Sequence, residues 1–206
     1  NVIAALCQAK AMKLTTAADV EQAAAIFRGR RCVVERWCEF SCEVSVIVAR
    51  SGEGSARAFP VAENIHTHHI LDFSIVPARV APAIAARAQQ LAAAIAEKLH
   101  VVGLLAIEFF VTTSGEVLVN ELAPRPHNSG HWSLDGCETS QFEQHVRAVC
   151  DLPLGGVEVR EATVMVNILG DAGRGEENLA IAAPPWQVIL AKPWARLHLY
   201  GKAEPR

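Results

Sequence analysis

No apolar run in this chain approaches the roughly 20 residues that a membrane-spanning helix needs. Residues 1–13 also lack the basic start and the cleavage site that are typical of a signal peptide. The 19 basic and 22 acidic side chains give a formal net charge of −3, which offers no electrostatic argument for a nucleic-acid or membrane partner. We therefore expect no nucleic acid, no membrane and a cytoplasmic location.

The six cysteines include no C-x-x-C pair, and no second Cys/His pair stands at zinc spacing beside Cys38 and Cys42. This pattern favours reduced thiols over a disulfide framework. The cluster His66, His68 and His69 suggests zinc, but no fourth ligand follows nearby. Adjacent residues of a strand also point to opposite faces, so metal binding by this cluster is the weaker interpretation. No G-x-G-x-x-G or Walker-type phosphate loop occurs.

The chain is nevertheless long enough to bury a core, since 206 residues with 51% hydrophobic and 20% charged side chains are typical of a globular protein. The segment LPLGG at residues 152–156 is rich in proline and glycine, which is typical of a loop between domains. We therefore predict a boundary between residues 1–156 and residues 157–206.

The most informative stretch reads as a β-hairpin, with strands at residues 103–112 and 117–122 around the turn residues 113–116. If the turn centres on Ser114 and Gly115, Glu108 lies opposite Glu121 on the same face. Two carboxylates so placed in apolar strands repel each other and are costly to desolvate. A divalent cation would relieve both penalties, and Mg²⁺ typically takes one or two carboxylates plus phosphate oxygens. The alternative is a slipped register that leaves one glutamate in solvent.

Other elements follow from local patterns. Thr16 to Asp19 reads as a capping box that opens a helix, and strands are predicted at residues 32–38 and 44–49. A helix is predicted at 77–101 and another from residue 140, with short strands at 162–169 and 194–200. The 77–101 helix should bury Ile84, Ala88, Leu91, Ile95 and Leu99, and the helix from residue 140 should bury Phe142, Val146 and Val149.

The segment NELAPRPHNSGH at residues 120–131 resembles the signature of the 5-(carboxyamino)imidazole ribonucleotide synthase family, ATP-grasp enzymes of purine biosynthesis. The similarity extends to residues 43–50, 139–155, 165–171 and 197–206. It implies an α+β fold: the C-terminal part of an ATP-grasp domain, an antiparallel sheet with packed helices, followed by a small β-rich C-terminal domain. It implies ATP- and bicarbonate-dependent carboxylation of 5-aminoimidazole ribonucleotide through carboxyphosphate, and a homodimer.

The same resemblance assigns roles to residues. For the nucleotide it implies Glu35, Arg36, Trp37, Cys38, Glu43, His66, Asn120 and Glu121. Within this set, the backbone of residues 35–38 would meet adenine and Glu43 would accept hydrogen bonds from the ribose hydroxyls. For Mg²⁺, with Mn²⁺ as an alternative, it implies Glu108 and Glu121. For catalysis and substrate binding it implies Arg125, His127 and Asn128, with Lys202 on the substrate phosphate.

Two expected parts of that family are not found in this sequence. Residues 1–13 contain no glycine, so they do not resemble the family's glycine-rich loop over the phosphates, and their homology is doubtful. The family also carries a whole N-terminal domain and a further basic turn at its C-terminal end. We therefore expect the C-terminal two-thirds of such an enzyme, trimmed at its own end. The alternative is a catalytically inactive fragment that retains only nucleotide binding or oligomerisation.

Overall fold

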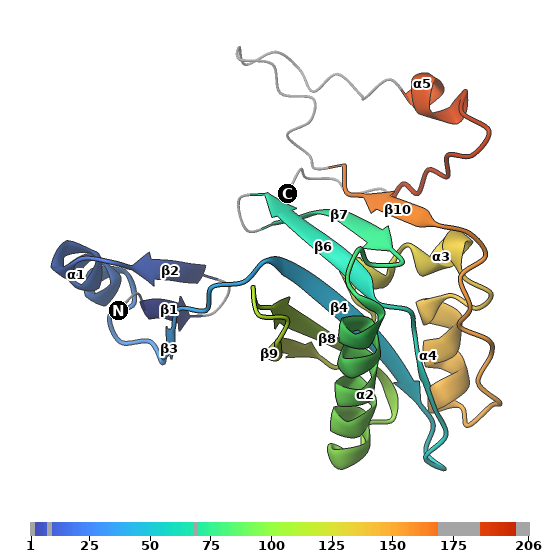
Figure 1. Ribbon diagram of the computed structural model, residues 1–206, viewed down its shortest axis with the longest axis horizontal. Helices are drawn as coiled ribbons and strands as arrows, with labels where there is room; N and C mark the ends of the chain where they lie inside the picture. The colour runs from blue at the N-terminus through green and yellow to red at the C-terminus, as the bar shows by residue number, and fades with distance from the viewer. Residues whose placement is uncertain (1–2, 8–9, 68–69, 169–185, 201–206) are drawn as a thin grey trace.

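The computed structural model describes residues 3–7, 10–67, 70–168 and 186–200. Two antiparallel sheets organise these residues: a three-stranded sheet in the order β2-β1-β3, and a seven-stranded sheet in the order β10-β7-β6-β4-β8-β9, in which β5 pairs with β4. Figure 1 shows the small sheet on the left, joined to the large sheet by the chain that leaves β3. No helix in the described part of the chain is long and apolar enough to cross a bilayer.

The small unit contains β1 (Ile3–Cys7), β2 (Lys10–Leu14), α1 (Ala17–Ile26) and β3 (Val33–Arg36). The predicted capping box is confirmed, because Thr16 Oγ1 accepts from the Asp19 N–H while the Asp19 carboxylate accepts from the Thr16 N–H. Leu14, Ala23 and Phe27 form the core of this unit. Sequence patterns did not predict β1 and β2, which form a hairpin that pairs with β3.

The large sheet is built from β4 (Cys42–Arg50), β5 (Ala56–Ala58), β6 (Ala62–Thr67), β7 (Ile70–Val76), β8 (Gly103–Val111), β9 (Val117–Ala123) and β10 (Thr163–Val166). The central strand β4 is buried along most of its length because apolar side chains leave it on both faces. One face carries Val44, Val46 and Val48 beneath α2, and the other carries Ile47 and Ala49 beneath the segment that leads to α4.

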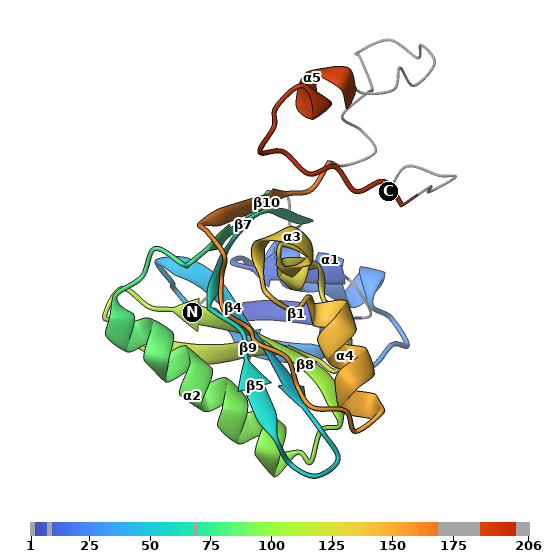
Figure 2. The same cartoon turned by 90° about the vertical axis from the view of Figure 1, so that its right-hand side faces the viewer.

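Helix α2 (Pro82–Lys98) covers the first of these faces, and Figure 2 shows it across the sheet from α4. The predicted range of 77–101 is too long, because β7 continues to Val76 and the helix begins only at Pro82. Its fully buried side chains are Ala88, Ala92 and Ala96, and Leu99 is 55% exposed. The predicted apolar stripe was therefore wrong at Leu99, and small alanines form the centre of the contact with the sheet.

The other face is covered by η1 (Asn128–Gly130), α3 (Ser133–Gly136) and α4 (Gln141–Val149). Ser140 caps α4 by accepting from the Glu143 N–H, as the sequence predicts. The predicted buried face of α4 was wrong: Phe142, Val146 and Val149 are 37%, 54% and 50% exposed. Gln141, Gln144 and Ala148 point inward instead, because loops beneath the helix carry backbone groups that need partners.

The C-terminal segment differs from the prediction in two places. Strand β10 occupies only part of the predicted range of 162–169, residue 169 lying outside the described residues, and it extends the large sheet by pairing with β7. Residues 194–200 contain no strand, although a strand was predicted there, and a short helix α5 (Trp186–Leu190) precedes them. Among the described residues, no strand pairs with this segment, so extended sequence alone does not make it a strand.

Candidate functional site

A row of polar side chains crosses the face of the large sheet that lies opposite α2. Ser45 on β4 is directly opposite Glu108 on β8, and Glu108 is directly opposite Glu121 on β9. One pair further along β4, Glu43 is opposite Asn64 on β6. Directly opposed residues of antiparallel strands project to the same face. The sheet therefore gathers these five polar side chains on one surface.

The predicted opposition of Glu108 and Glu121 is confirmed, but by a different route from the one expected. The turn pairs Val111 with Val117, one residue away from the predicted register, and the Thr112 N–H donates to the Glu116 carbonyl at 2.9 Å. A bulge then inserts Asn120 between the pairs Phe109–Val119 and Glu108–Glu121. The extra residue restores the acidic pair and leaves Asn120 exposed.

The surroundings of Glu108 disfavour its charged form. Burial raises the pKa of Glu108 above its ordinary value, and the nearby carboxylates of Glu121 and Glu43 raise it further. The positive charges of His66 and Arg125 act in the opposite direction. A buried carboxylate that faces other carboxylates is a site where a cation would be favourable.

Glu43 and His66 form an ion pair on this face, with Glu43 Oε2 3.1 Å from His66 Nδ1. Both side chains are about one-fifth exposed. Glu43 raises the pKa of His66 by pairing with the protonated ring, and this effect exceeds the opposing effect of burial. Glu43 and His66, two of the residues that the family resemblance assigns to the nucleotide pocket, therefore touch each other.

The loop after β9 brings His127 to the acidic pair. His127 Nε2 lies 3.8 Å from Glu108 Oε1, and burial together with nearby Arg125 lowers the pKa of His127 to about 4. Arg125 itself is exposed, and its guanidinium donates to the Pro126 carbonyl at 3.0 Å. Asn128 opens η1 and is half-buried. The buried Trp132 anchors the end of the loop by packing edge-on against Phe59.

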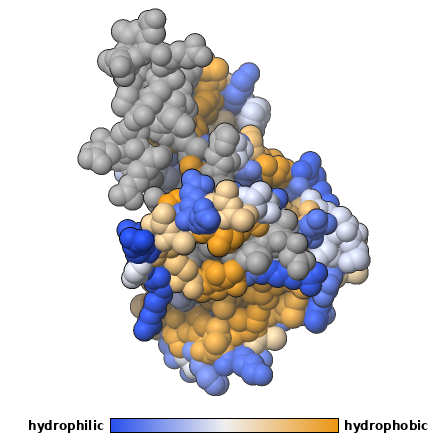
Figure 3. Space-filling model, turned by 90° about the vertical axis from the view of Figure 1, so that its left-hand side faces the viewer, coloured by the Kyte–Doolittle hydropathy of each residue, from blue (hydrophilic) through white to orange (hydrophobic). Residues whose placement is uncertain are grey.

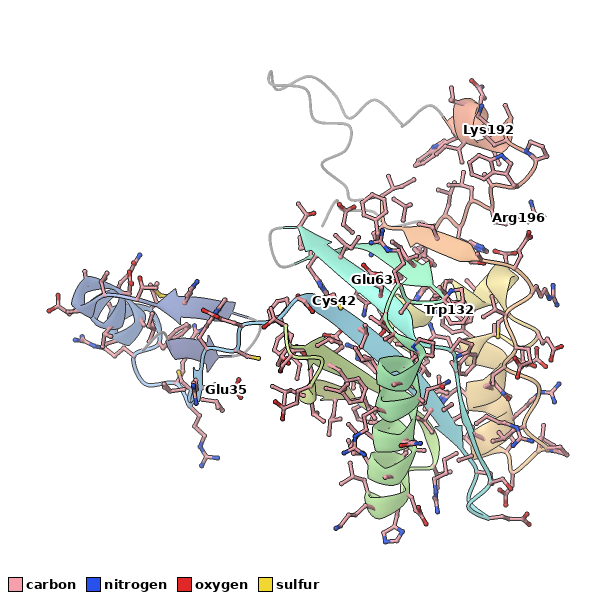
Figure 4. All side chains as sticks on the ribbon, viewed as in Figure 1. Glu35, Cys42, Glu63, Trp132, Lys192 and Arg196 are labelled. Atoms are coloured by element: carbon pink, nitrogen blue, oxygen red, sulfur yellow. The ribbon has the colours of Figure 1, made fainter. Side chains whose placement is uncertain are left out.

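The remaining predicted residues lie apart from this row. Glu35 and Arg36 are exposed on β3, and Trp37 follows with Lys13 Nζ 4.1 Å above its ring. In Figure 4, Glu35 lies in the small unit and Cys42 lies at the start of β4. Residues 37–41, which include Cys38, therefore connect the two sheets. Lys202, His68 and His69 lie outside the described residues.

Several polar residues of this face were missed by sequence reasoning. Ser45 donates to Ser129 at 2.9 Å, and Ser74 donates to Asn64 Oδ1 at 2.9 Å. Asn64 is 5% exposed, and within the described part of the chain its Nδ2 has no hydrogen-bond partner. The alternation Glu43-Val-Ser45-Val was a usable signal, since both polar residues fall on one face. No comparable signal marks Ser129, which lies 84 residues away from Ser45 in the chain.

The two carboxylates of Glu108 and Glu121 suit a hard cation that also binds oxygens of a ligand. Among the described residues no group of three or more His, Cys, Asp and Glu side chains is arranged to hold a metal ion. A two-carboxylate site suits Mg²⁺ when phosphate oxygens complete its shell. Glu108 and Glu121 would hold it. Asn64 Nδ2 on the same face is a hydrogen-bond donor and not a metal ligand, and it has no partner among the described residues.

Comparison with known proteins places this architecture in a family. Residues 11–142 match the model of the ATP-grasp domain, and residues 163–206 match the phosphoribosylaminoimidazole carboxylase C-terminal domain. The N5-carboxyaminoimidazole ribonucleotide synthase of Bacillus subtilis is 53% identical over 187 residues, which are 91% of this chain and 47% of that protein. The corresponding protein of Vibrio parahaemolyticus is 46% identical over 82% of this chain and 41% of its own length.

Solved structures agree with these matches. The Thermus thermophilus N5-carboxyaminoimidazole ribonucleotide synthetase has a TM-score of 0.87 at 37% identity, over 99% of this chain and 54% of that one. The Aspergillus clavatus N5-carboxyaminoimidazole synthase, solved with ADP and 5-aminoimidazole ribonucleotide, has a TM-score of 0.85 at 29% identity, over the same shares. The chain thus spans about half the length of its relatives, and the predicted fold class is confirmed. The chain belongs to the ATP-grasp family of ligases, in its N5-carboxyaminoimidazole ribonucleotide synthase group.

Proposed function

We propose that this chain serves the ATP- and bicarbonate-dependent carboxylation of 5-aminoimidazole ribonucleotide in purine biosynthesis. In this reaction ATP phosphorylates bicarbonate with release of ADP, and the resulting carboxyphosphate transfers its carboxyl group to the amine of the ribonucleotide with release of phosphate. The observation that carries the proposal is the opposed pair Glu108 and Glu121, with His127 Nε2 3.8 Å from Glu108. The relative solved with ADP and 5-aminoimidazole ribonucleotide supports these substrates.

On the nucleotide side, the backbone of residues 35–38 meets adenine and Glu43 accepts hydrogen bonds from the ribose hydroxyls. A carboxylate suits two neighbouring hydroxyls because it offers acceptors and no donor. His66 supports Glu43 through the 3.1 Å contact, and Asn120 and Glu121 border the phosphates from β9. Mg²⁺ or Mn²⁺ on Glu108 and Glu121 would supply charge neutralisation to the phosphates.

On the acceptor side, Arg125, His127 and Asn128 orient bicarbonate, carboxyphosphate and the ribonucleotide. An arginine can bind a phosphate or carboxylate with two parallel hydrogen bonds, and the exposed Arg125 can reach a ligand from the loop. Lys202 is proposed to contact the substrate phosphate. The division into an ATP-grasp part up to residue 156 and a small C-terminal domain from 157 to 206 also remains a proposal.

We further propose that the chain forms a homodimer. On the side of the molecule drawn in Figure 3, hydrophobic residues form a broad area bordered by hydrophilic ones. Large exposed apolar side chains among the described residues include Val34 on β3 and Val119 on β9, at 62% and 47% exposed. Large exposed apolar areas are typical of surfaces that bind another protein.

The test is ADP formation that requires both bicarbonate and 5-aminoimidazole ribonucleotide, measured together with Mg²⁺-dependent ATP binding. Turnover that needs both substrates would support the ligase. ATP binding without turnover would favour the alternative, a nucleotide-binding chain that does not catalyse the reaction. Folded protein that shows neither would overturn the proposed function.

A further inference from the structure

Among the described residues, the hydrogen bonds to the ring of His127 are made at Nδ1, while Nε2 lies 3.8 Å from Glu108 Oε1. Nδ1 accepts from the Ser129 backbone N–H at 3.4 Å and lies 2.9 Å from Ser129 Oγ. A backbone N–H can only donate, so Nδ1 must carry its lone pair toward Ser129. The proton of the neutral ring is therefore on Nε2, the nitrogen that faces Glu108 at 3.8 Å.

A second serine sets the direction of the hydroxyl contact. Ser45 Oγ donates to Ser129 Oγ at 2.9 Å, and both serines are almost completely buried, at 2% and 1% exposed. Because Ser129 Oγ accepts from Ser45, its own proton is available for donation to His127 Nδ1. The relay Ser45 to Ser129 to His127 thus favours the same tautomer as the backbone N–H.

The backbone beneath the ring is fixed as well. Gln141, which is fully buried, accepts from the His127 N–H at 2.9 Å and donates to the His127 carbonyl at 2.7 Å. A β-carbon at Gly130 would overlap the Ile47 side chain, so η1 packs directly against β4. The backbone that carries the ring is therefore held in place beside Ser129.

We propose that His127 serves the site as a neutral hydrogen-bond donor through Nε2–H, and that Ser129 and Ser45 are the positioning residues that fix this tautomer. A nitrogen that carries a proton has no lone pair for a metal ion and cannot accept a proton. His127 thus donates to an anionic oxygen of the ligand, of phosphate or bicarbonate chemistry, and it is not the base that deprotonates the amine. This inference rests on the proposed function for the nature of the ligand, but the tautomer itself can be read without turnover.

The test is a long-range ¹H–¹⁵N correlation spectrum of the chain labelled with ¹⁵N-histidine, recorded at neutral pH. The His127→Gln variant identifies the His127 signals by their loss. We expect a protonated Nε2 and an unprotonated Nδ1 in the wild-type chain. A protonated Nδ1, or averaged signals from both tautomers, would overturn the proposal even if ATP binding and turnover are intact.

Two variants test the positioning residues. Ser129→Ala and Ser45→Ala should each move the ¹⁵N chemical shifts of the two His127 ring nitrogens toward the average of the two tautomers. The change should be larger in Ser129→Ala. Ser41→Ala is the matched control, because the Ser41 hydroxyl donates to the Val111 carbonyl and not into this relay, and it should leave the signals in place. Unchanged signals in both test variants, or an equal shift in the control, would contradict the role of the relay. If Ser129→Ala does not fold, Ser45→Ala and the wild-type spectrum decide.

Discussion

Gln141 and Gln144 lie one turn apart on the inward face of α4, and each pairs with both backbone groups of one loop residue. Gln141 binds the N–H and carbonyl of His127 at 2.9 and 2.7 Å. Gln144 binds the N–H and carbonyl of Gly155 at 2.9 and 2.8 Å. Both side chains are 0% exposed. One helix thereby anchors the loop that carries His127 and the segment that leads to β10.

This arrangement makes Gln141→Leu and Gln144→Leu a matched pair of variants. Each should lower the free energy of unfolding by about 1–3 kcal/mol, because a backbone N–H loses its partner. Denaturant unfolding measures this loss, and hydrogen exchange locates it. The His127 amide should lose protection only in Gln141→Leu, and the Gly155 amide only in Gln144→Leu. Equal loss at both amides in either variant would contradict separate anchoring.

The acidic pair predicts a variant that loses ligand binding and keeps its stability. Glu121→Gln removes one of the two carboxylates, so Mg²⁺-dependent ATP affinity should fall about tenfold or more, which corresponds to about 1.4 kcal/mol. Without ligand its unfolding midpoint should not fall, because a like charge opposite Glu108 is removed. Calorimetric titration with MgATP measures the affinity. The exposed Glu116→Gln in the same hairpin is the control, and an equal affinity loss there would argue against the metal site.

The contact between Glu63 and Arg79 predicts a loss of stability in acid. Three hydrogen bonds from Arg79 reach the Glu63 carboxylate at 2.6–3.1 Å and lower the pKa of Glu63. Since the folded pKa is depressed, the stabilisation is present above the unfolded value of about 4.3 and is lost as the pH falls through the folded pKa. Glu63→Gln should therefore lower the thermal midpoint at neutral pH by a few degrees and flatten its decline in acid. Glu143→Gln, in an ion pair whose glutamate is 52% exposed, should change little.

The contact between Glu43 and His66 predicts the opposite pH dependence of stability from the contact between Glu63 and Arg79. Because Glu43 raises the folded pKa of His66, its stabilisation is present below the unfolded value of about 6.5 and is lost as the pH rises through the folded pKa. In Glu43→Gln the pKa of His66 should fall, since burial then acts with less compensation. A ¹H NMR titration of the His66 ring measures the shift. Glu53→Gln changes an exposed residue in the turn after β4, and it should leave the titration curve of His66 as it is in the wild type.

Local patterns in the sequence predicted the elements that carry the chemistry. Residues 103–122 formed the expected hairpin, Thr16 and Ser140 capped their helices, and Glu108 came to lie opposite Glu121. The turn register was wrong by one residue, because a bulge is a matter of how two strands fit together and no residue type alone marks Asn120 as the extra one. The motif at residues 120–131 indicated the family, and the comparisons confirmed it.

Long-range contacts decided the buried face of α4 and the side chains that meet at the site. The apolar positions of α4 predicted that Phe142, Val146 and Val149 face the core, yet the buried face holds two glutamines. Ser45 and Ser129 are 84 residues apart in the chain and meet only in the folded protein.

The sequence by itself determined the hairpin at residues 103–122, the caps of Thr16 and Ser140 and the facing of Glu108 and Glu121, because these depend on neighbours within a few residues or across one turn. Only the tertiary structure decided which face of α4 is buried and which side chains surround the ring of His127. The physical reason is that buried backbone groups and a buried imidazole must find hydrogen-bond partners. Those partners are supplied by segments that are distant in sequence.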